Sequence, residues 1–410
     1  METAPHATET PVLQGVRIVE FGWAVVGPLT TSWAGNHGAE VIKIETRTRP
    51  DIIRSMTPFQ GDEAHVDNSL FFGRENASKL SMALNLKHSK AVAIAKRLVA
   101  SSDAVVESYT AGVMEKWGLG HRDLREVKPD LVMLSSCMYG QTGRLRSMPG
   151  YGVPLTAVSG LTYLCGWPDR PPTGPYGSYT DYLVPRFNLL ALVSALDYRR
   201  RTGLGIHLDA SQLEAAVQFV APALLQWEVE GRIAGRSGNG DPQGAPHGVY
   251  RCLGKDRWVA IAVFSEAHWK GLCEALGNPP WIAQPSFSSF EARKANQREL
   301  DRHLEEWTLV REAGEAMRLL QEQGVPAGVV NDGRDLGEDP QLLHEGYYRR
   351  LEHPRMGPVD YADHSIRFSR SRHEVRRSPC LGEHTEHVCR EILGMETAEI
   401  ESLTAEGVFE

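Results

Sequence analysis

The pattern of apolar and polar positions in the N-terminal third predicts short strands separated by helices. Apolar and β-branched residues run through 16–21 (VRIVEF) and 39–44 (AEVIKI), and each run predicts a strand. Between them, segment 28–36 begins with a proline, which is typical of the first turn of a helix. The alternation continues with helices over 88–101 and near 124 and with strands over 104–107 and 131–135. We therefore expect an α/β fold with a parallel, doubly wound sheet.

The pattern changes after residue 148. Segment 149–180 is rich in Gly, Pro and Tyr, which predicts a loop or a binding surface. Two long helices are predicted over 182–201 and 211–231, with a brief strand at 206–209. The Gly/Pro-rich segment 237–248 predicts a domain boundary. Beyond it, a smaller α+β domain is predicted from two short strands around a turn at 254–256, a strand at 325–330, and helices over 266–276 and 298–305. The last predicted helices are 384–393 and 398–406.

Composition narrows the class of protein. The 410 residues carry 44 Lys plus Arg against 52 Asp plus Glu, a net charge of −8, which argues against a generic basic nucleic-acid binder. No apolar stretch approaches the roughly 20 residues that a membrane helix needs, and the N-terminus lacks a signal-peptide layout. The six cysteines form no C-x-x-C pair, so neither a zinc site nor a disulfide framework is signalled. We expect a cytoplasmic protein of about two domains, with no metal, no nucleic-acid partner and no membrane partner.

The turn after the first predicted strand, 21–27 (FGWAVVG), is where a doubly wound fold binds ligands. It is not G-x-G-x-x-G, which disfavours a dinucleotide. Cations are frequent in the following hundred residues, and this local excess suits a polyphosphate ligand such as CoA, ADP or a nucleotide. A solvated surface is the competing interpretation. The series comprises Lys43, Arg47, Arg49, Arg54, Arg74, Lys79, Lys87 and Lys116.

Asp181 follows the Gly/Tyr-rich segment and precedes a predicted helix (SYTDYLVP). A carboxylate is ionised near neutral pH, so it needs no partner base to attack an acyl group. By position alone, an aspartate at a helix start is more often a cap than a nucleophile. Both interpretations stay open at this level.

The order and spacing of nine segments resemble family III CoA-transferases, the group of formyl-CoA transferase, carnitine CoA-transferase and α-methylacyl-CoA racemase. The resemblance extends from about Leu13 to Phe409. The segments are LQGVRIVEF, GAEVIKIE, SKLSMALNLK, VVESYTAGVMEKWGLG, LVMLSSCMYGQTG, SYTDY followed by ALDYRRRTGLGIHLDASQLEA, APHGVYRC, VPAGVV and PCLGEHTEHV.

The resemblance implies a particular architecture. A large Rossmann-like domain would be built from both ends of the chain, 1–236 and 331–410, with 237–330 as a smaller inserted α+β domain. The large domain would carry the CoA site and the catalytic aspartate in its N-terminal part. The family also implies an interlocked-ring homodimer, or a related heteromer with a homologous subunit.

The resemblance further implies an activity, the transfer of CoA from a donor acyl-CoA to a free carboxylic acid. Asp181 matches the catalytic aspartate, which would pass through an aspartyl anhydride and an aspartyl-CoA thioester. Succinyl-CoA is a candidate donor, and coenzyme A enters only as the acyl-CoA co-substrate. Gly150-Tyr151-Gly152 replaces the Gly-His-Asp segment of the racemases, which favours transfer over racemisation. The alternatives are intramolecular CoA transfer on a diacid, racemisation, and a non-catalytic CoA-binding subunit.

CoA contacts are carried over residue by residue from the same resemblance. Arg47 stands beside Thr46, which occupies the position of the family's arginine, and Lys116 replaces another arginine. Gly238, Asn239 and Gly240 are candidates for a flap over the acyl site or for a linker. The aromatic stretch 163–182 and Trp23 suggest an apolar pocket for an aromatic or branched acid. The implied CoA contacts are Ala24, Val25, Val26, Arg47, Leu84, Lys87, Ser108, Tyr109, Lys116, Pro149 and Gly150.

Overall fold

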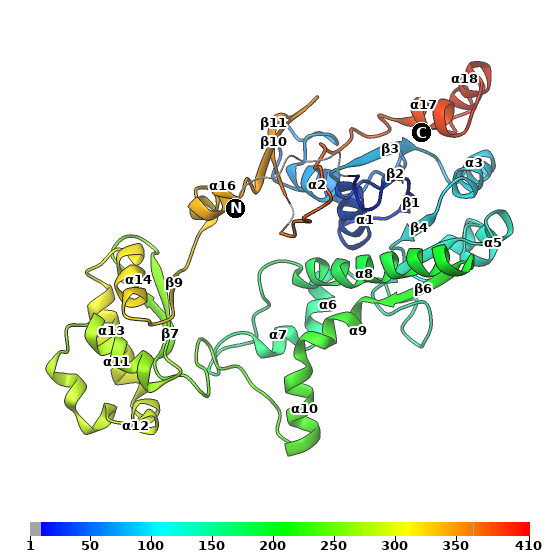
Figure 1. Cartoon of the computed structure of the whole chain (residues 1–410). Helices are drawn as coiled ribbons and strands as arrows, with labels where there is room; N and C mark the ends of the chain where they lie inside the picture. The colour runs from blue at the N-terminus through cyan, green and yellow to red at the C-terminus, as the bar shows by residue number, and fades with distance from the viewer. Residues whose placement is uncertain (1–9, 364) are drawn as a thin grey trace. The chain divides into compact units, whose positions relative to one another are not determined.

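The structure is a computed structural model that describes residues 10–363 and 365–410, and these form two compact units (Figure 1). The larger unit combines residues 10–163 with 174–234 and 344–410. The smaller unit contains 164–173 and 235–343. Each unit has its own hydrophobic core, so each is described separately below.

The larger unit is built on a six-stranded sheet in the order β3-β2-β1-β4-β5-β6, with every neighbouring pair parallel. The predicted parallel α/β sheet is therefore confirmed. The strand order reverses between β1 and β4, and in such sheets ligands bind outside the carboxyl ends of the strands at this point. The strands are β1 Arg17–Phe21, β2 Glu40–Glu45, β3 Lys79–Ala83, β4 Ala104–Glu107, β5 Val132–Cys137 and β6 Ile206–Ser211.

Helices cover both faces of this sheet. Ile18 faces α1 and α8, where Leu192 packs, whereas its neighbour Val19 faces α3 and α5, where Leu98 packs. Burial on both faces explains why β1, β2, β4 and β5 are rich in apolar residues. The helices of this unit are α1 Val26–Asn36, α2 Leu70–Glu75, α3 Ser89–Ala100, α4 Val113–Lys116, α5 His121–Val127, α6 Gly152–Val158, α8 Tyr179–Thr202, α9 Gln212–Val217 and α10 Ala221–Glu230, with a 3₁₀ turn η1 at Ile52–Ser55.

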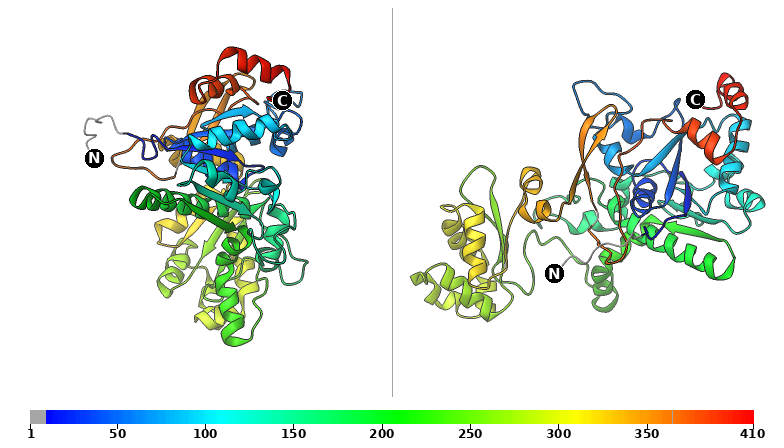
Figure 2. Two further views of the ribbon diagram at one scale, coloured as in Figure 1. Left: turned by 90° about the vertical axis from the view of Figure 1, so that its right-hand side faces the viewer. Right: turned by 45° about the horizontal axis from the view of Figure 1, so that its top comes forward.

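The C-terminal segment closes the edge of the sheet at β3. The hydroxyl of Thr385 accepts a hydrogen bond from Ala83 N–H at 2.9 Å, and His384 N–H donates to the Ser81 carbonyl at 2.9 Å. In the views of Figure 2, the red C-terminal helices lie beside the blue and cyan elements of this unit. The segment contains α17 Thr385–His387, a π-helical turn Val388–Ile392 and α18 Thr397–Ala405, and a hairpin of β10 Tyr348–His353 and β11 Gly357–Ala362 precedes it.

The smaller unit pairs a three-stranded antiparallel sheet, β7-β8-β9, with helices on its apolar side. Val259 and Ile261 on β8 are fully buried against Leu300 and Leu320 of two of these helices. The strands are β7 His247–Arg251, β8 Trp258–Ala262 and β9 Ala327–Val329. The helices are α11 Glu266–Ala275, α12 Phe290–Ala295, α13 Gln297–Thr308, α14 Ala313–Glu322 and α15 Gly333–Gly337, with 3₁₀ turns at Pro280–Ala283 and Pro285–Phe287; α7 Leu161–Leu164 and α16 Pro340–His344 lie where the chain passes between the units.

Two predicted segments differ from the structure. Segment 149–180 is not all loop, because α6 and α7 form within it, and the GVPLTAV sequence of α6 buries Leu155. The single helix predicted over 211–231 is broken by a 3₁₀ turn at Gln218–Val220. Pro222 explains the break, because it has no N–H to continue the preceding helix and sits in the first turn of α10.

Candidate active site

A cavity of about 440 Å³ opens at the carboxyl ends of β1, β2, β3 and β4, within the larger unit. Its walls come from the turns after these strands, from the start of α6 and from the first turn of α8. The lining residues are Gly22, Trp23, Ala24, Val25, Val26, Ile44, Glu45, Thr46, Thr48, Arg49, Asp51, Leu84, Asn85, Leu86, Lys87, Ser108, Tyr109, Thr110, Val113, Trp117, Pro149, Gly150, Tyr151, Gly152, Asp181 and Gln212.

The turn after β1 is held in an unusual shape from two sides. Ala24 has a φ of 62°, a left-handed conformation that a residue with a side chain rarely adopts. The Asp51 carboxylate accepts a hydrogen bond from Ala24 N–H at 3.0 Å. On the other side, the Ser108 hydroxyl accepts from Trp23 N–H at 3.0 Å and donates to the Trp23 carbonyl at 3.3 Å. The turn is thus fixed before any ligand arrives.

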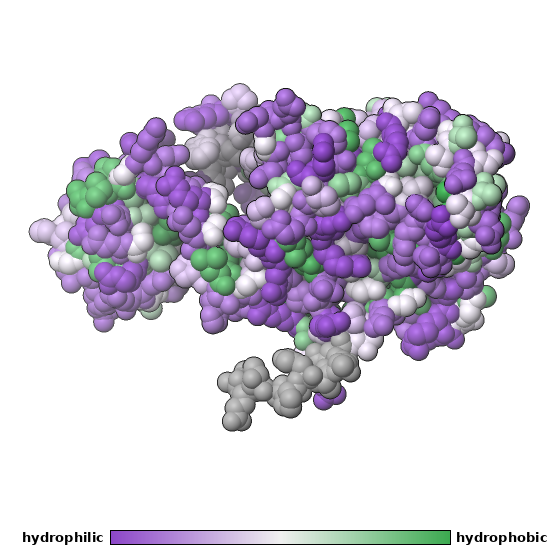
Figure 3. All heavy atoms as spheres, turned by 90° about the horizontal axis from the view of Figure 1, so that it is seen from above, coloured by the Kyte–Doolittle hydropathy of each residue, from purple (hydrophilic) through white to green (hydrophobic). Residues whose placement is uncertain are grey.

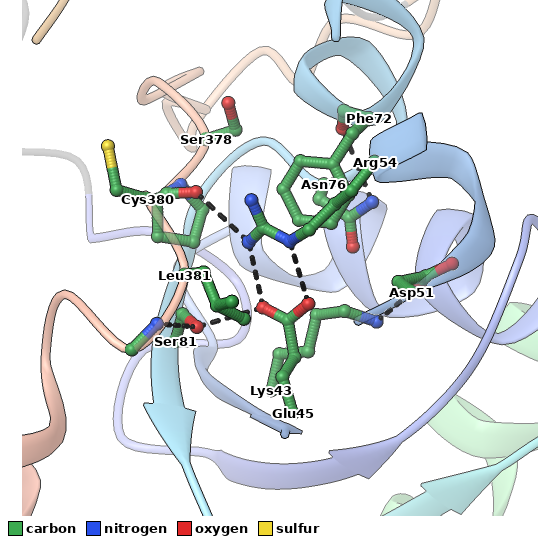
Figure 4. A network of polar contacts seen from close by, with 12 residues as sticks. Lys43, Glu45, Asp51, Arg54, Phe72, Asn76, Ser81, Ser378, Cys380 and Leu381 are labelled. Carbon is green, nitrogen blue, oxygen red and sulfur yellow. Dashed lines mark hydrogen bonds and ion pairs between the residues drawn. The ribbon is translucent and has the colours of Figure 1, made fainter. Parts of the chain in front are cut away.

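A buried ion network contacts this turn, and Figure 4 shows its pair of Lys43 with Asp51. The fully buried Lys43 ammonium donates to the Gly22 carbonyl at 2.9 Å and pairs with Asp51 at 3.0 Å. It also pairs with Glu20 at 2.9 Å. Burial alone would raise the pKa of Glu20, but Lys43 and Lys79 outweigh it and hold that pKa at about 2. Lys43 therefore holds the turn at Gly22 directly and at Ala24 through Asp51.

A second ion pair anchors the segment that follows β2. The Arg54 guanidinium binds both oxygens of Glu45 at 2.8 Å and reaches Asp67 at 2.9 Å. Figure 4 shows this guanidinium facing the Glu45 carboxylate, and its carbon lies 3.5 Å from the Phe72 ring centroid. Such bidentate pairs are geometrically specific. Arg54 is 1% exposed, so its role is to hold the cavity wall rather than to meet a ligand.

The cations of the sequence series separate into three groups. Lys43, Arg54 and Lys79 are buried in ion pairs. Arg49 and Lys87 line the cavity, and the Arg49 guanidinium carbon lies 4.6 Å from the centroid of the Trp23 ring. Arg47, Arg74 and Lys116 are exposed and are outside the lining.

Most residues implied as CoA contacts line this one cavity, and two do not. Arg47 and Lys116 lie outside the lining. Gly238, Asn239 and Gly240 belong to the smaller unit, where Gly238 N–H donates to the Gly166 carbonyl at 2.9 Å. The implied contacts in the lining are Ala24, Val25, Val26, Leu84, Lys87, Ser108, Tyr109, Pro149 and Gly150.

Asp181 is in the first turn of α8 and contributes to the same cavity wall, with 9% of its surface exposed. The backbone of Gly152 lies against its carboxylate, since a Cβ added at Gly152 would be 2.4 Å from Oδ1. Within residues 10–363 and 365–410, no group donates a hydrogen bond to this carboxylate. The Asp181 oxygens are therefore free to meet a ligand.

A second buried carboxylate accompanies Asp181. Glu75, the last residue of α2, is 4% exposed and accepts a hydrogen bond from the Tyr182 hydroxyl at 3.4 Å. Burial raises the pKa of Glu75 to about 7. Burial, and secondarily the charge of Glu75, raises the pKa of Asp181 to about 7 as well. Two buried acidic groups with raised pKa values therefore lie near the start of α8, and of these Asp181 lines the cavity.

Sequence reasoning does not single out Gln212 and Asp51, which line the cavity, or Glu75, which lies near Asp181 outside the lining. Glu75 carries no motif, and only the fold brings it near α8. Gln212 lines the cavity and donates to the Ser136 carbonyl at 3.1 Å, again without a sequence signal. Asp51 has a recognisable signal, because an acidic residue before a short apolar run is typical of a helix cap; its carboxylate accepts from Ile53 N–H at 3.3 Å.

In the part of the chain that the structure describes, no three His, Cys, Asp or Glu side chains gather as metal ligands. Among residues 10–363 and 365–410, no helix is long and apolar enough to cross a membrane.

Comparison with known proteins gives consistent findings. Residues 13–385 match the model of CoA-transferase family III. The chain is 30% identical over 400 residues to succinyl-CoA:glutarate CoA-transferase of Mus musculus, covering 97% of this chain and 90% of that protein. It is 30% identical to succinyl-CoA–D-citramalate CoA-transferase of Chloroflexus aurantiacus, covering 97% and 98%. The structure of a CAIB/BAIF family protein from Brucella suis superposes with a TM-score of 0.86 and 28% identity, covering 94% of this chain and 100% of that chain.

Proposed function

The chain belongs to CoA-transferase family III, and from that premise we propose that it moves CoA from a donor acyl-CoA to a free carboxylic acid with Asp181 as the nucleophile. The observation that carries the proposal is the position of the Asp181 carboxylate. It lies in the wall of the same cavity as the pinned turn Trp23–Val25, without a hydrogen-bond donor among the described residues.

The cavity suits CoA as a substrate. Arg49 and Lys87 supply positive charge for phosphates, and charge-assisted hydrogen bonds are the strong ones. Tyr109 and Trp117 form an edge-to-face pair, 5.2 Å between centroids, that lines the cavity with an apolar aromatic surface for the base. We assign the phosphates to the Arg49 side and the thioester to the Asp181 side of this one cavity.

In the first half-reaction, an oxygen of Asp181 attacks the thioester carbonyl carbon of the donor. The carbon–sulfur bond breaks, CoA leaves as a thiolate, and a mixed anhydride links the acyl group to Asp181. The thiolate then attacks the Asp181 carboxyl carbon, which releases the donor acid as a carboxylate and leaves an aspartyl-CoA thioester. The two steps conserve the activated acyl bond, so no ATP is consumed.

In the second half-reaction, the acceptor carboxylate attacks the aspartyl-CoA thioester, and the same two steps run in reverse. Each attack forms an oxyanion, and we assign its stabilisation to backbone N–H groups of the cavity-lining segment 150–152. Because only Gly fits beside the Asp181 carboxylate at position 152, no second acid side chain enters there.

Racemisation at the α-carbon is the competing reaction, and it requires a base on each side of that carbon. Tyr151 stands where the racemases carry a histidine, so the imidazole that would act as one of these bases is replaced. Intramolecular CoA transfer on a diacid would use the same Asp181 chemistry. Incubation in D₂O distinguishes racemisation from CoA transfer, because racemisation incorporates deuterium at the α-carbon and CoA transfer does not.

For the donor we propose succinyl-CoA. Relatives named for glutarate, D-citramalate and L-malate transfer all carry succinyl-CoA in their names, while a relative from Acetobacter aceti, 32% identical over 83% of this chain and 86% of that protein, is named acetyl-CoA:oxalate CoA-transferase. Small dicarboxylic acids are therefore the first acceptors to test. An aromatic or branched acceptor remains a prediction from the sequence; within 163–182, only Asp181 lines the cavity.

We further propose that the protein works as a dimer, or as a pair with a homologous chain. Relatives of Chloroflexus aurantiacus include alpha and beta subunits of one transferase. Helix α10 buries none of its residues, and it exposes 57% of Trp227 and 58% of Leu225. By contrast, the face drawn in Figure 3 is mainly hydrophilic. An apolar helix surface of this kind is typical of an association interface.

The experiment that tests the transfer chemistry is covalent trapping. The protein is incubated with succinyl-CoA and hydroxylamine, digested, and analysed by peptide mass spectrometry. We expect a hydroxamate on the Asp181 peptide of the wild type and of Asp197→Asn, a change of an exposed aspartate on the same helix. Asp181→Asn should give none. An unmodified Asp181 peptide in the wild type, under conditions where acyl-CoA binds, would overturn the proposal.

A further inference from the structure

We propose that Glu75 is a positioning residue of the transfer chemistry that acts by holding a proton beside Asp181, so that the pair reacts while it carries a single negative charge. This inference rests on the proposed function of Asp181. Glu75 belongs to no recognised motif. It lies on α2, whereas the nucleophile Asp181 lies on α8.

The geometry joins α2 to α8 at their ends. Glu75 is the C-terminal residue of α2, and Asp181 is in the first turn of α8. Tyr182, which directly follows Asp181, donates its hydroxyl to Glu75 Oε1 at 3.4 Å. Both carboxyl groups are at least nine-tenths buried. Burying two acids together is costly unless they share protons or find cations.

The cations near Glu75 are committed elsewhere. Lys79 pairs with Glu20 at 2.7 Å and donates to the Asn76 side chain and to the Pro28 carbonyl. Arg74 is exposed to solvent. Among the described residues, no cation forms an ion pair with Glu75 or with Asp181. The pair therefore lacks the counter-charge that would keep both members ionised.

Of the elements packed against α2 and α8, helix α9 contributes Glu214 and strand β6 contributes His207 and Asp209. Helices α1 and α6 contain no charged side chain. The 3₁₀ turn η1 contributes Arg54, which is bound to Glu45 and Asp67. Strand β11 contributes Asp360, paired with Arg350, and Tyr361, whose hydroxyl bonds with Ser378. On α8 itself, the Arg186 guanidinium carbon lies 5.0 Å from the centroid of the Trp33 ring.

The chemistry explains why one proton is needed. With two protons on the pair, Asp181 has no anionic oxygen for attack. With none, Glu75 adds a second buried negative charge near Asp181, which disfavours the approach of the acceptor carboxylate to Asp181. The pKa values of both groups, raised to about 7, are consistent with a pair that holds one proton in total at neutral pH.

The test is the pH dependence of the CoA-transfer rate at saturating substrates. For the wild type we expect a bell, with a limb on each side of neutral pH. Glu75→Gln keeps the shape of the side chain and removes its charge. It should abolish the alkaline limb and move the acidic limb to lower pH by at least about one unit, a tenfold gain in the low-pH rate. Glu126→Gln, a change of an exposed residue on α5, should leave the bell unchanged.

Tyr182→Phe provides a second variant should Glu75→Gln fail to fold. Removing the hydroxyl withdraws a hydrogen bond from ionised Glu75, so the alkaline limb should move to higher pH. A profile of the folded variants that superposes on the wild type overturns the role of Glu75. Hydroxamate trapping at neutral pH tells the two negative results apart. If Asp181 is trapped but the limbs of the pH profile do not move, only the role of Glu75 is overturned. If Asp181 is not trapped, the proposed function is overturned.

Discussion

The α-carbon of Gly152 and the carboxylate of Asp181 are so close that a Cβ on Gly152 would lie 2.4 Å from Oδ1 and 2.4 Å from Ser178 Cβ. Gly152→Ala must therefore push the Asp181 side chain out of its position. We expect the transfer rate to fall by about 100-fold, because misplacing a reacting group by about 1 Å carries a cost of that order. Steady-state kinetics with succinyl-CoA measures the loss.

The matched control for this change is Gly174→Ala. Its nearest neighbour would be the Thr162 hydroxyl at 3.6 Å, an ordinary contact, so activity should stay within a factor of about two. Thermal unfolding of both variants tests whether the effect is local. A Gly152→Ala protein with wild-type kinetics would contradict the close packing of the two residues.

Asp181 also makes the protein less stable at neutral pH. Its pKa is 3.8 in the reference state and about 7 in the folded protein, so the folded state binds the proton more tightly. The contribution of Asp181 to stability is therefore largest below about pH 4, decreases as pH rises towards 7, and is constant above that. We expect Asp181→Asn to raise the free energy of unfolding by about 2–4 kcal/mol at pH 8 and by little at pH 4. Urea unfolding at the two pH values checks this, and an equal effect at both would contradict it.

The ion pair of Lys43 with Asp51 should matter more for substrate binding than for the chemical step. Asp51→Asn retains an oxygen for Ala24 N–H but leaves Lys43 without one of its anions. Because Lys43 keeps Glu20 as a partner, we expect a loss of about 1–3 kcal/mol in unfolding free energy. In the folded fraction, the KM for acyl-CoA should rise about tenfold while kcat changes little. Asp51→Ala, which also frees the turn, should raise KM further; equal KM values for the two variants would argue against a role of the turn.

Arg49 and Arg47 can be told apart by binding measurements. Arg49 lines the cavity and Arg47 does not, although the sequence favours Arg47. Arg49→Ala should weaken acyl-CoA binding by about 10- to 100-fold, the range for a hydrogen bond to a charged group. Arg47→Ala serves as the control and should bind nearly normally. Calorimetry with CoA and with pantetheine separates the effects, because only CoA carries the nucleotide phosphates.

The apolar surface of α10 should be covered in the active assembly. Leu225→Asp adds a charge to this surface, where Leu225 is 58% exposed. We expect the assembled protein to dissociate in sedimentation velocity, with loss of activity at low protein concentration. Leu343→Asp, at a similarly exposed position outside α10, should not change the sedimentation coefficient. A wild type that sediments as a monomer would contradict the proposed association.

The strands β1, β2, β4 and β5 are predictable from sequence because each is rich in apolar residues, although Glu20 and Lys43 interrupt β1 and β2. Strand β3 (KLSMA) gives a weaker signal. Its polar residues Lys79 and Ser81 are buried nonetheless, because Lys79 pairs with Glu20 and Ser81 donates to Glu45. Because these partners are far apart in the sequence, no local periodic pattern indicates that Lys79 and Ser81 are buried.

The residues of the candidate site also differ in how far the sequence predicts them. The resemblance to family III CoA-transferases points to Asp181 and to the turn Ala24–Val26, because both stand at matching positions along the chain. Glu75 is found only from the fold, because α2 and α8 meet through a contact that spans 107 residues. Arg47 and Arg49 are both loop residues, and the sequence does not show which of the two side chains lines the cavity. In the structure Arg49 lines it, and its guanidinium carbon lies 4.6 Å from the centroid of the Trp23 ring.

The C-terminal cover of β3 has a consequence for biosynthesis. Until residues 381–385 leave the ribosome, Ala83 N–H and the Ser81 carbonyl have no partner on the outer side of the sheet. An uncovered edge strand is a template for pairing with other chains. Nascent or truncated chains that stop before Leu381 should therefore depend on chaperones and tend to aggregate, and the wall of the cavity formed after β3 would be the last part of the site to mature.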